Sequence, residues 1–110
     1  MITVSVKRDQ DKRVASFSVS GHSGFAERGQ DIVCAGVSAV VQTTILGLQD
    51  VLAIDCSGSQ RDGQIVCSLP ILEPGLRLKA DILVETMLLG LTAIASSYAE
   101  YIQVLDLKEV

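Results

Sequence analysis

The fold of this chain is decided around residues 21–38, which read GHSGFAERGQDIVCAGVS. Three glycines fall within the first nine of these residues and interrupt any regular period, because glycine adopts backbone angles that other residues avoid. Asp31 is a residue type that caps helices, and apolar residues recur at spacings of three and four from Ile32 to about Leu52. The stretch therefore predicts a mobile loop that leads into a first helix.

Two short stretches before this loop alternate between apolar and polar residues. They cover residues 2–7 and 15–19, and a polar stretch at residues 9–13 separates them. A period of two is typical of β-strands with one buried face. The beginning of the chain therefore predicts a β-hairpin that runs into the loop.

A second hairpin is indicated after the first helix. Residues 54–59 and 64–69 flank Asp62-Gly63, a pair whose preference for positive backbone angles suits a tight turn. Cys56 and Cys67 fall on this hairpin, diagonally on one face, and we expect them to pack in the core.

The last third of the chain predicts a long helix and a short strand. After Pro74-Gly75, apolar residues recur with helical spacing from about Asp81 to Ile102, and residues 104–107 alternate weakly. We expect these last residues to add an edge strand beside the first hairpin. The predicted fold is an α+β sandwich in the order ββαββαβ, with an antiparallel or mixed sheet packed against two helices. At 110 residues the chain has the length of one domain, residues 1–110.

Composition narrows the class of protein. Hydrophobic residues make up 48% of the chain and charged residues 20%, which favours a folded domain, and the net charge of −4 disfavours nucleic-acid binding. Gly36 and Ser38 interrupt the apolar stretch that contains them, and the first residues lack an export signal. We expect a soluble cytoplasmic protein that does not contact a membrane.

The metal-binding and disulfide-forming residues are few. Three cysteines without CxxC spacing fit neither a disulfide framework nor a zinc site, and one histidine with scattered carboxylates predicts no metal cluster. No cofactor is expected, and at least one thiol should be free.

Cys34 and His22 are the residues suited to nucleophilic chemistry. If Asp31 caps the helix, Cys34 lies in the first turn, where unpaired N–H groups and the helix macrodipole favour a thiolate. His22 is the only imidazole, and the glycine-containing loop can bring it back to the helix start. Cys34 would attack a carbonyl, and His22 would take the thiol proton and return it to the leaving amine. Backbone N–H groups near Cys34 would stabilise the oxyanion.

Each of these residues also has a purely structural interpretation. Cys34 is compatible with a small buried core residue, and His22 with a loop side chain that bonds a carbonyl. Asp31 could orient His22, but a carboxylate beside the sulfur opposes the thiolate, so capping is favoured. Ser38, one turn after Cys34, could bond His22, the substrate or the Cys34 carbonyl.

Residues 21–38 closely resemble the signature of the ribosomal-processing cysteine protease family, Prp. That signature is a Gly-His pair, a glycine-containing loop and a Gly-x-Asp-Ile-Val-Cys-Ala-x-x-Ser helix start. The length and element order of the chain are compatible with the family throughout, although only this segment is diagnostic. One departure is Ser23, where many relatives carry Ala.

The resemblance implies a cysteine endopeptidase that removes a short N-terminal extension from large-subunit ribosomal protein number twenty-seven during ribosome assembly. By position, Cys34 is similar to the nucleophile and His22 to its acid-base partner, with Asp31 and Ser38 as supporting residues. The loop is similar to a lid over an extended hydrophobic peptide. The residues that match this substrate-binding lid are Gly21, Ser23, Gly24 and Gly29. The resemblance also implies a homodimer.

Two other functions fit parts of the sequence. A non-catalytic module that binds a ribosomal protein or assembly factor would use Cys34 only as a core residue. A thiol redox sensor would need a resolving cysteine near Cys34, and neither Cys56 nor Cys67 is close in sequence. The acidic balance suits a basic ribosomal partner in the first case as well as in proteolysis.

Overall fold

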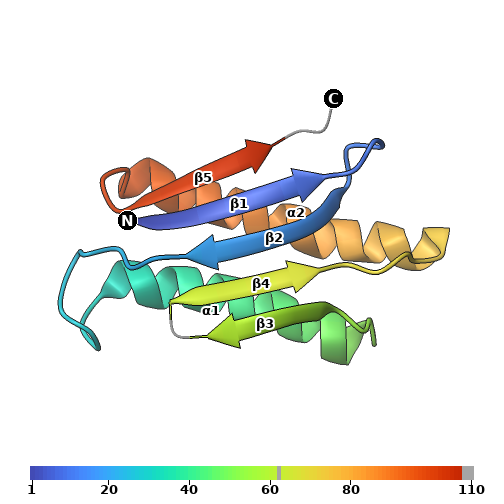
Figure 1. The fold of residues 1–110 in the computed structure, drawn as a ribbon, viewed down its shortest axis with the longest axis horizontal. Coiled ribbons are helices and arrows are strands. Elements are labelled where there is room, and N and C mark those ends of the chain that lie inside the picture. Colours follow the sequence, from blue (N-terminus) through green and yellow to red (C-terminus); the bar gives the residue numbers. More distant parts are fainter. Residues whose placement is uncertain (62, 108–110) are drawn as a thin grey trace.

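The computed structural model describes residues 1–61 and 63–107, and its elements follow the predicted order (Figure 1). A short π-helix, η1, continues the first helix, so the helical segment ends close to the predicted Leu52. The elements in chain order are β1 (Ile2–Arg8), β2 (Val14–Ser20), α1 (Ile32–Leu46), η1 (Gly47–Val51), β3 (Ser57–Arg61), β4 (Gln64–Ser68), α2 (Pro74–Ser97) and β5 (Ile102–Leu107).

The five strands form one mixed sheet in the order β3-β4-β2-β1-β5. Neighbouring strands are antiparallel except for β1 and β5, which are parallel, with Ile2 beside Ile102 and Lys7 beside Leu107. Both helices cover the same face of this sheet (Figure 1). The predicted α+β sandwich and the edge strand beside the first hairpin are confirmed, with the sheet mixed rather than antiparallel.

The core lies between the sheet and the helices and is almost entirely aliphatic. On β1 the buried residues are those of the predicted alternation, because every second side chain points toward the helices. Phe17 is the one aromatic residue that is fully buried there. The helices contribute Val33, Val37 and Val41 from α1 and Val84, Met87 and Leu91 from α2.

The predicted bounds of the second helix are wrong at both ends. The helix begins at Pro74, because the side chain of Glu73 caps it by accepting the N–H groups of Leu76 at 2.6 Å and Gly75 at 3.2 Å. Proline is favourable at this first position because its missing N–H needs no partner there. The helix ends at Ser97, and Ile102 already belongs to β5.

The second hairpin is shorter than predicted. Its first strand begins at Ser57, and Ile54 is buried just before it. Asp62, half of the predicted turn, lies outside the described residues. Gly63 has a positive φ of 76°, as the turn prediction requires.

Charged side chains hold the end of the sheet where β1 finishes. Arg8 binds Glu85 of α2 at 2.7 Å and Asp106 of β5 at 2.8 Å, and these carboxylates, Asp106 first, raise its pKa above the usual value. Nearby, the buried Arg77 donates to the Val14 carbonyl and pairs with Asp81 at 2.9 Å. These contacts tie α2 to three strands.

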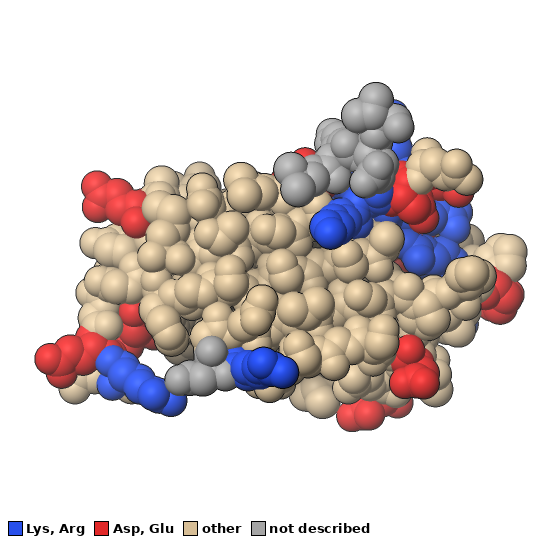
Figure 2. All heavy atoms as spheres, viewed as in Figure 1, with Lys and Arg blue, Asp and Glu red and all other residues tan. Residues whose placement is uncertain are grey.

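The sheet face away from the helices is polar but mostly uncharged. In Figure 2, charged side chains lie at the margins of this face, and its middle carries other residue types. The strand registers show the cause, because serines from β1, β2 and β4 lie on neighbouring positions there, such as Ser5, Ser18 and Ser68.

One helical segment, Ile32–Val51, is long and apolar enough to cross a membrane by length and composition. Gly36 and Ser38 interrupt it, as the sequence shows, but they do not make it too polar for that test. The finding is weak evidence for a membrane, because the core helix of a globular protein passes the same test. Here α1 packs its valines beneath the sheet.

Candidate active site

The first turn of α1 is fixed by Asp31, which caps the helix as predicted. Its backbone is extended, with φ −88° and ψ 101°, and its Oδ1 accepts the N–H of Cys34 at 2.9 Å. Asp31 also accepts a hydrogen bond from the N–H of Val33. The cap therefore places Cys34 in the first helical turn.

Ser23 joins the loop to this cap. Its side chain is buried, with 4% of the residue exposed, and its hydroxyl donates to Oδ2 of Asp31. The same oxygen of Ser23 accepts the N–H of Phe25 at 3.1 Å. Hydrogen bonds from Ser23 and then from backbone N–H groups lower the pKa of Asp31 to about 2. Asp31 is therefore an ionised anchor between loop and helix, and it makes no hydrogen bond to His22.

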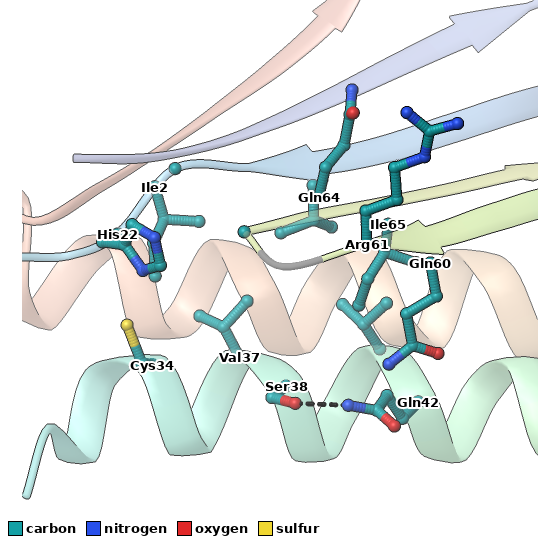
Figure 3. A pocket seen from close by; sticks show the side chains of 14 residues that line it. Ile2, His22, Cys34, Val37, Ser38, Gln42, Gln60, Arg61, Gln64 and Ile65 are labelled. Atoms are coloured by element: carbon teal, nitrogen blue, oxygen red, sulfur yellow. Dashed lines mark hydrogen bonds between the residues drawn. The ribbon is translucent and has the colours of Figure 1, made fainter. Parts of the chain in front are cut away.

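Cys34 opens onto a cavity rather than into the core. It is half-buried, and its sulfur points toward the imidazole of His22 (Figure 3). The hydrogen bond that Sγ accepts comes from the backbone N–H of Ser23, at 3.5 Å, and not from the ring. The structure thus brings the thiol and the sole imidazole into one cavity, from a helix start and a strand end.

The backbone around His22 depends on two glycines. Gly21 has a φ of 88°, and a Cβ on it would overlap the carbonyl oxygen of Met1. Its N–H donates to the carbonyl of Gly63 at 2.9 Å, and a Cβ on Gly63 would lie 3.1 Å from Nε2 of His22. Side chains at these two positions would displace the ring, so glycine is required at both.

The cavity has a volume of about 590 Å³ and runs along α1 from Cys34. Apolar side chains form its floor, among them Val37 and Val41 of α1 and Ile65 of β4. Polar residues of α1 and of the β3–β4 hairpin line the rest, including Ser38, Gln42, Gln60 and Gln64. An apolar floor with polar walls suits an extended peptide.

The predicted supporting and lid residues have separate fates. Ser38 lines the cavity, but its oxygen accepts the Nε2–H of Gln42 at 2.6 Å, a partner that the sequence did not suggest. Of the four lid residues, Gly21 lines the cavity, whereas Ser23, Gly24 and Gly29 do not. Ser23 is instead part of the cap, and its hydroxyl matters more than the sequence comparison with Ala suggested.

The loop is also held by aromatic residues. Phe25 meets Tyr98 and Tyr101 edge to face, with ring centroids 5.7 Å and 5.2 Å apart. Such contacts stabilise by a modest amount each and fix the loop against the end of α2 and the start of β5. The sequence gave no signal for this cluster, because the three residues are distant along the chain.

The predicted oxyanion donors are partly occupied. The N–H groups of Val33 and Cys34 at the helix start already donate to Asp31. The N–H that points at the sulfur comes from the loop, at Ser23.

The other two thiols do not join the site. Cys67 is buried and Cys56 half-buried, and burial raises the pKa of both, that of Cys67 to about 12. Neither lines the cavity of Cys34, so no resolving cysteine is available there. Within residues 1–61 and 63–107, no group of three or more His, Cys, Asp or Glu side chains is placed to hold a metal ion.

Comparison with known proteins agrees with this geometry. The family model described as cysteine protease Prp matches residues 1–103. The ribosomal processing cysteine protease Prp of Bacillus subtilis (strain 168) is 37% identical, over 94% of this chain and 96% of that protein. Two crystal structures of the essential ribosomal processing protease Prp from S. aureus, one with a covalently linked product peptide and one with a substrate peptide, superpose with TM-scores of 0.89 and 0.82. They are 27% and 26% identical, over 97% of this chain and 100% of each of those chains.

Proposed function

The chain belongs to the Prp family of ribosomal processing cysteine proteases, and from this premise we propose that Cys34 is its nucleophile and His22 its acid-base partner. The observation that carries the proposal is the placement of both side chains in one cavity, facing each other across the start of α1 (Figure 3). Asp31 and Ser23 would position the sulfur without touching the reacting atoms.

The reaction would proceed in two stages. Sγ of Cys34 bonds to the scissile carbonyl carbon while its proton passes to His22. The tetrahedral intermediate collapses, the C–N bond breaks, and His22 protonates the leaving amine. A water then attacks the thioester with His22 as base, and the acid product leaves the thiol restored.

The Ser23 N–H is the donor best placed for the oxyanion. It points at the sulfur, and the oxyanion forms on the carbon that binds that sulfur. Because Asp31 already accepts the N–H of Cys34, the loop supplies what the helix start does not. Closure of the loop over a substrate, as a lid, would bring this N–H to its target.

For the substrate we propose the N-terminal extension of large-subunit ribosomal protein number twenty-seven. The support is the family, the peptide complexes of the S. aureus relative and an open cavity that can accept an extended chain. The net charge of −4 is compatible with a basic ribosomal protein. Action in the cytoplasm is part of the same proposal.

We propose a homodimer as well. Its support is the outer surface of the helices, where Leu46, Ile82 and Leu89 are 56%, 67% and 73% exposed. A second copy could cover them. Sedimentation analysis of the wild type and of Leu89→Glu tests this, and a monomeric wild type would refute it.

The decisive experiment is mass spectrometry of the candidate ribosomal precursor after incubation with the enzyme. We expect one cleavage by wild type, none by Cys34→Ser or His22→Ala, and normal cleavage by the matched control Cys56→Ser. Circular dichroism checks that each variant folds. Full cleavage by folded Cys34→Ser would overturn the assignment of the nucleophile, and an intact precursor with wild type would overturn the substrate.

A further inference from the structure

The cavity extends well beyond the two reacting side chains and ends in neutral polar groups. Ser38 and Gln42 lie one and two turns along α1 from Cys34, and Gln60 reaches the same region from β3 (Figure 3). The Gln42 amide donates to Ser38 at 2.6 Å, which fixes its orientation. The Gln60 side chain points toward Gln42 across the cavity, and no described residue forms a hydrogen bond with its carboxamide.

The helix sets how far this polar end lies from the reaction. Gln42 follows Cys34 by eight residues, so at about 1.5 Å per residue it lies about 12 Å along the axis. An extended peptide advances about 3.3 Å per residue. A peptide that follows α1 would therefore place its third or fourth residue from the scissile bond between Gln42 and Gln60.

The chemistry of this end selects a neutral side chain. Two carboxamides and a hydroxyl offer donors and acceptors but no charge to balance an ion that leaves water. Arg61, the one charged residue that lines the cavity, points away from Gln42 in Figure 3. The valine floor between Cys34 and Gln42 favours apolar residues nearer the cut.

We propose that Gln42 and Gln60 form a specificity subsite for a carboxamide side chain, Gln or Asn, three or four residues from the scissile bond. A carboxamide pairs with both glutamines at once, because each carries a donor and an acceptor. This inference rests on the proposed proteolysis and adds to it the substrate residue that the far end of the cavity reads.

The test uses synthetic peptides that span the candidate cleavage site, with Gln, Asn, Leu, Glu or Lys placed at each of positions two to five on either side. With wild type, kcat/KM should peak for Gln or Asn at position three or four on one side only. Replacement of that residue by Leu should lower kcat/KM by about tenfold, the loss expected for one to two neutral hydrogen bonds.

Variants locate the effect. In Gln42→Leu and Gln60→Leu the preference for Gln over Leu should vanish while the Leu peptide is cleaved as before. Gln49→Leu is the matched control, because Gln49 follows on the same helical segment but lies outside this cavity, and it should keep the preference.

The outcomes separate the two proposals. Failure to cleave any peptide would count against the proteolytic function itself. Equal cleavage of all peptides, or a preference unaltered in Gln42→Leu, would overturn the subsite alone. A preference for Glu that Arg61→Gln abolishes would assign specificity to Arg61 instead and would also overturn it.

Discussion

At the end of the sheet where β1 finishes, Arg8 and Arg77 join helix and strands through short ion pairs. At the other end, near Gly21, the loop is joined to α1 by hydroxyl and N–H groups around one carboxylate, and to α2 by aromatic edges. Ion pairs stabilise without leaving space. The Gly21 end instead leaves a cavity beside the sulfur and keeps its one carboxylate occupied, which places stability and chemistry at opposite ends of the same sheet.

The largest expected contrast is in thiol reactivity. At neutral pH, iodoacetamide should modify Cys34 at least about 100-fold faster than Cys67, because burial raises the pKa of Cys67 to about 12 and leaves little thiolate. A time course by peptide mass spectrometry measures both rates. In urea the rates should converge, and equal rates in the folded protein would contradict the placement of Cys34 at an open cavity.

A methyl group at the Gly21 end should affect activity next most strongly. In Gly21→Ala the new Cβ overlaps the Met1 carbonyl at a φ of 88°, so we expect at least about tenfold lower kcat/KM and about 2 kcal/mol lower stability. Gly24→Ala is the control, since its φ is also positive but nothing lies within 4 Å. It should cost about 1 kcal/mol and little activity. Similar activity losses in both variants would disprove the steric argument.

Removal of the ion pairs should change stability but not chemistry. Arg8→Ala should lower the free energy of unfolding by about 2 kcal/mol, less than for a fully buried pair because Glu85 is 44% exposed. Arg13→Ala, which loses one partly exposed pair of 3.5 Å, should lose less than about 0.5 kcal/mol. Urea titration gives both values. A large fall in kcat/KM of folded Arg8→Ala would break the separation of the two ends.

The smallest effect should be a pH dependence at the cap. The pKa of Asp31 is lower when folded, about 2 against 3.8, so its contribution is complete above about pH 4 and lost as the pH falls toward 2. The stability difference between wild type and Asp31→Asn should therefore narrow over that interval. Thermal unfolding from pH 5 to pH 2.5 follows it. A constant difference would show that the ionised carboxylate does not matter.

Local patterns predicted most of the fold. The period of two in β1 and β2 and the cap at Asp31 correspond to strands and to a helix start, because those features depend on neighbouring residues. The start of α2 was missed because Pro74-Gly75 was interpreted as a break, although proline after a capping Glu73 begins a helix. The parallel β1–β5 pairing followed only from the weak alternation at the end of the chain.

The site was predictable in part for the same reason. Cys34 and Asp31 belong to one helical turn, and the motif identified His22. The Gln42 contact to Ser38 and the position of Gln60 depend on tertiary packing, so no sequence spacing revealed them. Ser23 shows the opposite error, because its small size suggested a passive role and the structure gives its hydroxyl a buried partner.

The first strand starts at the mouth of the cavity, because Ile2 lines it and the Met1 carbonyl abuts Gly21. An affinity tag fused ahead of Met1 would emerge beside the sulfur, tethered at an effective concentration in the millimolar range. Such a tag would compete with added peptide or be trimmed by its own carrier. Leu107, beside Lys7 at the far end of the sheet, is where a purification handle leaves inhibition measurements undisturbed.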